Sequence, residues 1–247
     1  MGCRPCLWRR NSSLFRKNYH MKYDILKKIV QLKKEKKEFS IITNLNDSSN
    51  FIYLPTQNMA KELESYIDQI TLAYKNRSNG VIANTSFFID NYHLPIKVFI
   101  VGAVHIAQYF CEFAKHLNFE TIVIDPRGYF ASDKRFPDTK VISKWPSEAF
   151  QEIALTDRSA LIALTHDPKI DDPAIKEALH QKCFYIGALG SKKTHQNRID
   201  RLKESGFSEE QVKSIHGPIG INLGGRSASE IALSIIAQLV SKVYNIK

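Results

Sequence analysis

Residues 97–107 read KVFIVGAVHIA and decide the fold of this chain. The run 97–101 is short and mostly apolar, as expected of a buried strand, and an amphipathic helix pattern starts at His105. Gly102 makes the turn between them. The loop is a dinucleotide fingerprint in degraded form, G-x-V-x-x-A, because Val104 stands where a glycine would let the backbone approach a pyrophosphate. It predicts either a plain β-to-α turn or a loop that offers helix N–H groups to an anion.

The same pattern continues toward the C-terminus as alternating strands and helices. We expect strands at 97–101, 121–124, 139–142, 160–164 and 184–186, and helices at 105–117, 147–154, 173–181 and 192–204. Helix starts are indicated by Asp172-Pro173 and by two capping boxes, Ser208 with Gln211 and Ser227 with Glu230. This alternation predicts an α/β, Rossmann-like, doubly wound parallel sheet in residues 97–247.

A smaller α+β domain is expected in residues 21–92. Its predicted elements are a helix at 23–37, strands at 39–45 and 51–54, a helix at 57–76 capped by Thr56, and an apolar strand region at 81–89. The apolar residues of the first helix are expected on or near one face: Tyr23, Ile25, Leu26, Ile29, Val30 and Leu32. Residues 90–96 are predicted to be the linker. Residues 1–20 are expected to be a disordered tail or an overlong gene start, because the first convincing helix opens at Met21.

The formal charge of +10 is concentrated at one end of the chain. Residues 1–38 hold twelve Lys/Arg and three Asp/Glu, which leaves the other 209 residues at +1. We therefore expect no nucleic-acid-binding face. No run approaches the about 20 apolar residues of a membrane-spanning helix, and no secretory signal opens the chain, so we expect a cytoplasmic protein. One C-x-x-C pair, Cys3 and Cys6, is weak evidence for zinc, and no metal site is predicted.

Candidate binding residues follow the predicted strands, at the edge where open parallel sheets hold their ligands. Asp125 and Arg127 end the second strand. The acid suits a ribose or polyol hydroxyl, and the arginine is expected to pair either with phosphate or with Asp133 or Asp138. His166 and Asp167 end the fourth strand. There the histidine is expected to contact a ligand or to fix the loop, with the acid anchoring the turn.

The most informative loop is 187–195, GALGSKKTH. Gly187 and Gly190 bend the chain, Ser191 caps the next helix, and His195 lies in its first turn. Lys192 and Lys193 oppose the helix dipole there, which indicates a compensating anion. A later stretch, 216–227, again leads glycines into a capped helix.

Taken together, the motifs resemble the XdhC/CoxI family of accessory proteins for molybdenum hydroxylases. The resemblance runs through VFIVGAVHIAQ, VIDPRGYFASDKRFP, ALTHDPKIDDPAI, FYIGALGSKKTH, RIDRL and IHGPIGINLGGRSASEIALSI, over about 97–240. It implies a non-catalytic chaperone that binds molybdenum cofactor of the molybdopterin type and delivers it to xanthine dehydrogenase or a related enzyme; a homodimer is left open. The cofactor contacts it implies are Gly102, His105, Asp125, Arg127, His166, Asp167, Gly187, Gly190, Ser191, His195, Gly220 and Arg226.

The first domain is diverged from the family pattern. Family members usually carry G-S-x-P-R and S-G-G-C motifs there, whereas this chain has no glycine between Gly2 and Gly80 and no cysteine between Cys6 and Cys111. Two alternatives stay open. One is an NAD(P)-dependent oxidoreductase, suggested by the glycine turn followed by Asp125, and the other is a scaffold that kept the fold and lost the ligand.

Overall fold

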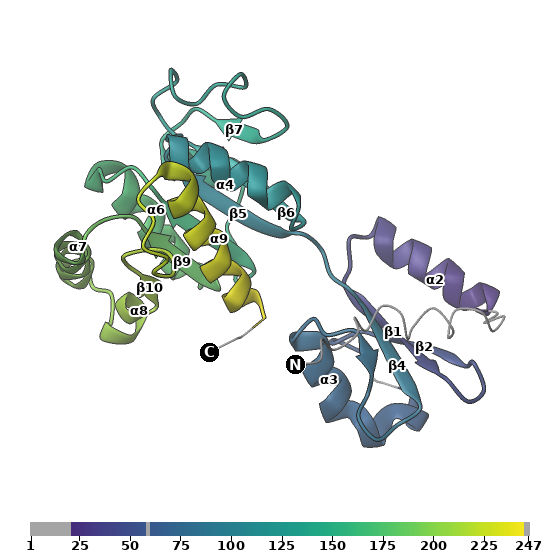
Figure 1. The fold of residues 1–247 in the computed structure, drawn as a ribbon. Helices are drawn as coiled ribbons and strands as arrows, with labels where there is room; N and C mark the ends of the chain where they lie inside the picture. Colours follow the sequence, from purple (N-terminus) through teal and green to yellow (C-terminus); the bar gives the residue numbers. More distant parts are fainter. Residues whose placement is uncertain (1–20, 58–59, 245–247) are drawn as a thin grey trace, which may run out of the picture. The chain divides into compact units, whose positions relative to one another are not determined.

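The computed structural model describes residues 21–57 and 60–244, and the chain divides into two compact units, Met1–Leu94 and Pro95–Lys247 (Figure 1). Each unit is described by itself. The predicted tail at residues 1–20, with Cys3 and Cys6, lies outside the described residues. None of the helices in the described ranges is both long enough and apolar enough to cross a membrane.

The first unit is built on a four-stranded antiparallel sheet of order β2-β1-β4-β3. Its strands are β1 (Phe39–Asn44), β2 (Asn50–Tyr53), β3 (Gly80–Val81) and β4 (Phe87–Tyr92), and its helices are α2 (Tyr23–Lys34), the 3-10 helix η2 (Lys61–Tyr66) and α3 (Ile67–Lys75). One apolar cluster joins the sheet to η2 and α3 through Leu63 and Ile70. A second joins it to α2 through Ile29 and Leu32. The unit therefore has its own core.

Three details of this unit differ from the sequence prediction. The helix after Thr56 begins only at Lys61, and residues 54–57 form a turn in which the Gln57 N–H donates to the Leu54 carbonyl at 3.1 Å. The linker is shorter than 90–96, because β4 pairs with β1 as far as Tyr92. In α2 the buried face holds Ile29 and Leu32, while three residues predicted for it are exposed: Tyr23, Leu26 and Val30.

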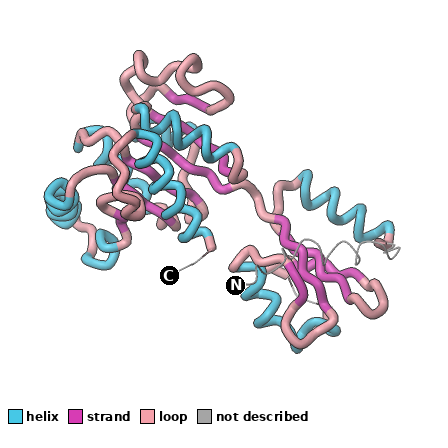
Figure 2. Tube along the Cα trace, viewed as in Figure 1, coloured by secondary structure: helices cyan, strands magenta, loops and turns pink. Residues whose placement is uncertain are grey.

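The second unit is a six-stranded parallel sheet of order β10-β9-β8-β5-β6-β7. Its strands are drawn in magenta in Figure 2. Its strands are β5 (Ile96–Val101), β6 (Phe119–Ile124), β7 (Lys140–Ile142), β8 (Ser159–Ala163), β9 (Tyr185–Ala188) and β10 (Ile215–His216). The first strand in sequence, β5, lies between β6 and β8, so the chain winds outward in both directions from the centre. This is the doubly wound Rossmann order that the alternating pattern predicted.

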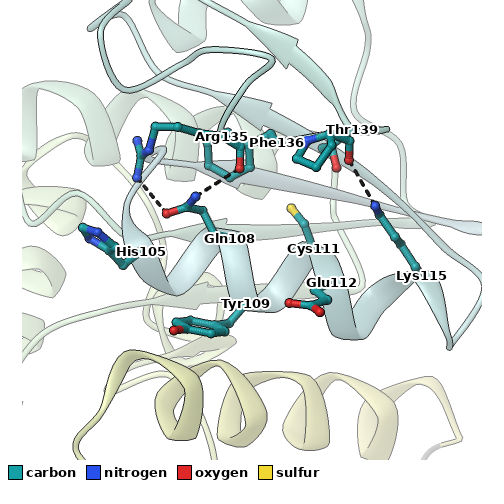
Figure 3. A pocket seen from close by; sticks show the side chains of 10 residues that line it. His105, Gln108, Tyr109, Cys111, Glu112, Lys115, Arg135, Phe136 and Thr139 are labelled. Carbon is teal, nitrogen blue, oxygen red and sulfur yellow. Dashed lines mark hydrogen bonds between the residues drawn. The ribbon is translucent and has the colours of Figure 1, made fainter.

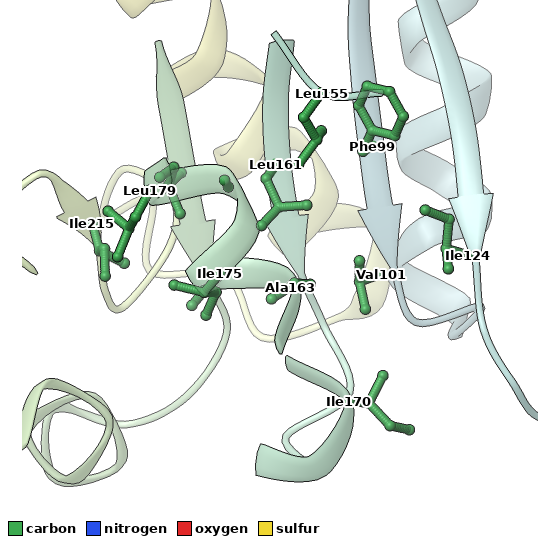
Figure 4. Packing of buried hydrophobic residues seen from close by; sticks show 14 of the residues in the cluster. Phe99, Val101, Ile124, Leu155, Leu161, Ala163, Ile170, Ile175, Leu179 and Ile215 are labelled. Atoms are coloured by element: carbon green, nitrogen blue, oxygen red, sulfur yellow. The ribbon is translucent and has the colours of Figure 1, made fainter. Parts of the chain in front are cut away.

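Helices cover both faces of this sheet. The helices are α4 (His105–Lys115), α5 (Pro146–Glu152), α6 (Pro168–His180), α7 (Lys192–Glu204), α8 (Glu209–Lys213) and α9 (Ala228–Val243). On one face α4 and α9 pack on Val98, Ile100 and Ile162. On the other, residues of α5, α6 and α7 pack on Phe99, Val101 and Leu161. Figure 4 shows Ile170, Ile175 and Leu179 of α6 in this cluster. Successive residues of β5 face opposite sides, and both sides are apolar because both are buried.

The start of α6 differs from the prediction. The helix begins at Pro168, and Asp167 is its N-cap, accepting a hydrogen bond from the Lys169 N–H at 2.9 Å. Pro173 therefore lies inside the helix, and Asp172 binds Arg201 of α7 through two hydrogen bonds of 2.7 and 3.0 Å. The two predicted capping boxes, at Ser208 with Gln211 and at Ser227 with Glu230, are both confirmed.

Candidate functional site

The strands of the second unit end level with one another. Val101 of β5 is in register with Ile124 of β6 and with Ala163 of β8, and Ala163 is in register with Ala188 of β9. Backbone hydrogen bonds continue one residue further, for example from the Gly102 N–H to the Ile124 carbonyl at 2.8 Å. The loops that carry the predicted site residues therefore leave from one edge, and strand order reverses there between β5 and β8.

Position 102 lies at this reversal point, and its backbone requires a glycine. Its φ is +113°, and a Cβ placed on it would lie 2.8 Å from the Cγ2 atom of Thr165, in the loop after β8. A larger residue would be strained and would press on that loop. The extended backbone of Val104 then starts α4 without a side-chain cap, and His105 opens the helix with its side chain exposed. The turn and the loop after β8 are thus in direct contact.

Asp125 is completely buried and is held from inside the protein. Its oxygens accept hydrogen bonds from the backbone N–H of Ala103 at 2.8 Å and of Arg127 at 2.9 Å, and from the Arg127 guanidinium at 2.9 and 2.8 Å. Burial by itself would raise the pKa of Asp125, but these donors outweigh it and hold the pKa below its usual value. The carboxylate is therefore engaged within the protein, rather than free for a ligand hydroxyl as the sequence suggested.

Arg127 is the cation that Asp125 positions. The expected protein partners were Asp133 or Asp138, but the ion pair forms with Asp125, and the guanidinium lies 4.8 Å from the ring centre of Phe130. The side chain remains 42% exposed. The hydrogen bond to Asp125 raises the pKa of Arg127, and the charges of Asp167 and Asp171 raise it further. A fixed, partly exposed positive charge therefore stands beside the loop after β8.

The loop after β8 is held by a buried carboxylate. Asp171 accepts hydrogen bonds from the Thr165 hydroxyl at 2.6 Å and from the His166 N–H at 3.1 Å. His166 has a φ of +63°, in the left-handed region, and its side chain is exposed. Asp167 caps α6, which matches the anchoring alternative given for it. The loop thus presents the His166 imidazole at the edge of the sheet. The neighbouring acids, Asp167 and Asp171, accept hydrogen bonds from within the protein.

The two glycines of the 187–191 loop make room for neighbouring side chains. A Cβ on Gly187 would lie 2.4 Å from the Ile219 side chain, so this glycine lets the 217–220 segment lie against β9. Gly190 has a φ of +144° and meets the side chain of Thr194. Ser191 is the N-cap of α7 and accepts a hydrogen bond from the Thr194 N–H at 3.1 Å, as predicted.

The remaining predicted residues lie in the stretch before α9 or pack beside it; they are His195, Gly220 and Arg226. The His195 ring lies against Gly217, its Nδ1 atom is buried without a hydrogen-bond partner, and burial lowers the pKa of the imidazole. Gly220 donates its N–H to the Gln238 side chain at 2.9 Å and leaves no room for a Cβ beside Ser234. The backbone N–H of Arg226 donates to Glu230 at 3.0 Å, and its side chain is exposed.

Two pockets flank these loops. One, of about 310 Å³, lies between the loop after β8 and α7, and its lining residues are His166, Pro168, Asp171, Lys193, Thr194, Asn197, Arg198 and Arg201. The other, of about 440 Å³, lies between α4 and residues 135–139 and includes His105 and Tyr109 (Figure 3). There Arg135 and Gln108 hydrogen bond to each other. Among the described residues, no cluster of His, Cys, Asp and Glu could hold a metal ion.

The first pocket contains a residue that the sequence prediction missed. Arg198 is 2% exposed and lines this pocket, although it sits in a helix whose sequence, KKTHQNRIDRLKE, is mostly polar. A polar helix is expected to be solvated, so no single position in it stands out. The only sequence signal was the RIDRL string within the family resemblance.

The comparisons with known proteins agree with this architecture. The XdhC Rossmann domain family matches residues 98–239. A molybdenum cofactor insertion chaperone, PaoD of Escherichia coli K12, is 38% identical over 104 residues, which are 42% of this chain and 32% of that protein. A Bacillus subtilis 168 protein, named as a probable subunit of xanthine dehydrogenase, is 26% identical over 157 residues, 63% of this chain and 46% of that protein. The chain thus spans less than half the length of these two relatives.

A solved structure shows the same fold. A crystal structure from Bacillus halodurans, described as a xanthine dehydrogenase, superposes with a TM-score of 0.68 at 21% sequence identity. The superposition covers 91% of this chain and 65% of that one.

Proposed function

We propose, from the premise that this chain belongs to the XdhC family, that it binds molybdenum cofactor of the molybdopterin type and delivers it to a molybdenum hydroxylase such as xanthine dehydrogenase. The observation that carries the proposal is the convergence of three loops at the strand-order reversal. There the Gly102 turn contacts Thr165, and the charge of Arg127 lies near the loop that presents His166. PaoD, which aligns with part of this chain, is named for cofactor insertion.

The residues at this edge suit an anionic, hydrogen-bonding ligand. Arg127 provides a fixed guanidinium, His166 an exposed imidazole, and the start of α7 the positive end of a helix dipole beside Lys193. The bound cofactor supplies the molybdenum chemistry of the recipient enzyme. This chain's residues hold and orient it. Because these side chains are exposed or partly exposed, the cofactor can leave toward a docked partner.

The oxidoreductase alternative is less well supported. Dinucleotide-binding domains of this fold use a free acid to accept hydrogen bonds from a ribose, whereas the Asp125 oxygens are occupied by Ala103 and Arg127. Val104 also replaces the glycine beside which a pyrophosphate would lie. A calorimetric titration with NAD(H) and NADP(H) separates the two functions, and micromolar affinity for either would favour the enzyme.

Cofactor retention tests the proposal directly. The full chain is purified from a host that makes molybdenum cofactor, oxidised, and assayed for the fluorescent pterin product, with a host lacking the pathway as the blank. We expect pterin only from the first host. His166→Asn should reduce it several-fold without altering the fold, because asparagine tolerates the left-handed backbone of this position. Lys203→Gln, on an exposed part of α7, is the matched control. No retained pterin in the wild-type chain would refute cofactor binding.

Delivery has a separate readout. The loaded chain is mixed with a cofactor-free molybdenum hydroxylase, and the appearance of enzyme activity is compared with that produced by free cofactor. Faster or more complete activation by the loaded chain is expected. Activation equal to that by free cofactor would leave binding standing and remove the delivery role.

A further inference from the structure

Arg198 of α7 is a buried cation that the protein leaves partly unpaired. Its side chain is 2% exposed, and one nitrogen, Nη2, donates to the Leu189 carbonyl at 3.1 Å. Its Nε and Nη1 atoms are buried without a hydrogen-bond partner. Burial lowers the pKa of this guanidinium. Burying unsatisfied charged donors is costly, so their presence beside a pocket points to a group that is bound there during function.

The nearest carboxylate does not satisfy these donors. The Oδ2 atom of Asp171 lies 4.0 Å from Nη2 of Arg198, at the limit of an ion pair. Its oxygens are instead directed to the loop after β8, where they accept from the hydroxyl and N–H of Thr165 and the N–H of His166. Nor is Arg201 available as a substitute cation, because Asp172 holds it in a two-point ion pair.

The pocket beside Arg198 has room for a phosphate group and is lined mostly by polar side chains, among them the Asp171 carboxylate. Its volume is about 310 Å³, and besides Arg198 it offers the Lys193 ammonium, the Thr194 hydroxyl and the Asn197 amide. Lys193 and Asn197 are exposed and Thr194 is half-buried, so these side chains form the solvent-facing part of the lining. The positive end of the α7 dipole adds to the potential, because Lys193 and Thr194 lie in its first turn.

We propose that Arg198 anchors an oxyanion subsite in this pocket that takes the phosphate group of a phosphate monoester. Nε and Nη1 lie on different edges of the planar guanidinium, so one of them donates to a phosphate oxygen, and Lys193 and Asn197 complete the shell. Where the phosphate group is that of the pterin cofactor, the inference rests on the proposed function. The binding of inorganic phosphate does not depend on that function.

The test uses the full chain and inorganic phosphate. Thermal unfolding and calorimetric titration are measured with phosphate against chloride at matched ionic strength, so that general screening cancels. Phosphate should raise the unfolding temperature of the wild type. Arg198→Lys keeps the charge but replaces the planar guanidinium, which the Leu189 carbonyl holds in place, by a single ammonium group, and it should weaken phosphate binding about tenfold or more. Lys203→Gln removes one charge from the same helix outside the pocket and should bind like the wild type.

A second variant guards against a folding defect at the buried position. Lys193→Gln changes an exposed side chain and should weaken phosphate binding several-fold while the unfolding temperature without phosphate stays unchanged. The proposal is overturned if phosphate does not stabilise the wild type, or if it stabilises Arg198→Lys and Lys193→Gln as strongly as the wild type.

Cofactor retention in the same variants distinguishes the two proposals. Loss of retained pterin in Arg198→Lys, together with loss of phosphate binding, assigns the subsite to the cofactor. Phosphate binding that depends on Arg198 in a chain that never retains pterin would support the subsite and refute the proposed function.

Discussion

Asp125 joins the glycine turn after β5 to the loop after β6, because it accepts from Ala103 and from Arg127 at once. Asp125→Asn removes the charge and places an amide NH₂ where an acceptor is needed. We expect a loss of about 2–3 kcal/mol in the free energy of unfolding, less than for a fully buried pair because Arg127 is partly exposed. Denaturant melts measure it. Asp138→Asn is the control, since Asp138 is an exposed member of an ion pair with Lys115.

The same pair has a defined pH dependence. The native pKa of Asp125 is lowered, so its contribution is complete above the pKa of the unfolded chain, about 3.9, and is lost as pH falls through the lower native value. The stability difference between the wild type and Asp125→Asn should therefore be constant near neutral pH and narrow from about pH 5 downward. A difference that grew in acid would contradict the assignment.

Sequence alone located Asp125 at the correct strand end but did not show which groups its oxygens bind. An acid after the second strand of such a fold suggests a ligand hydroxyl, and only the three-dimensional path of the loop shows that Arg127 turns back onto it. Arg198 was harder still to recognise. Its burial depends on packing against the loop that contains Leu189 and near Asp171, and neither contact follows from the spacing of residues within α7.

At the scale of one element, α6 contains two equivalent start signals, Asp167-Pro168 and Asp172-Pro173. The sequence does not rank them, because each offers a capping acid and a first-turn proline. In the structure Asp167 caps the helix, and Asp172 instead binds Arg201 of another helix. Elements without such competition were predicted well, including the two capping boxes and the strands at the centre of the sheet.

Two substitutions distinguish these starts. Pro173 lies inside α6 and lacks the N–H that would bond to the carbonyl four residues before it. Pro173→Ala should therefore raise the free energy of unfolding by about 1 kcal/mol. Asp167→Ala should lower it by about 1 kcal/mol through the loss of the N-cap. Urea melts of both variants provide the measurement. If the helix began at Pro173, the free energy of unfolding would not rise in Pro173→Ala and would not fall in Asp167→Ala.

At the scale of the whole molecule, the second unit has two apolar clusters of its own, one on each face of its sheet. The residues proposed to hold the ligand all belong to this unit. We expect residues 95–247, expressed alone, to unfold in one cooperative transition and to bind phosphate like the full chain. Thermal melts by near-ultraviolet circular dichroism and the phosphate titration test this. A fragment that folds but fails to bind would place a required contact in the first unit.

The outer strands of the parallel sheet, β7 and β10, contain three and two residues. A long unpaired edge strand can pair with a strand of another molecule, whereas edge strands this short leave few backbone groups unpaired. Two copies of this chain therefore gain little by joining their parallel sheets border to border.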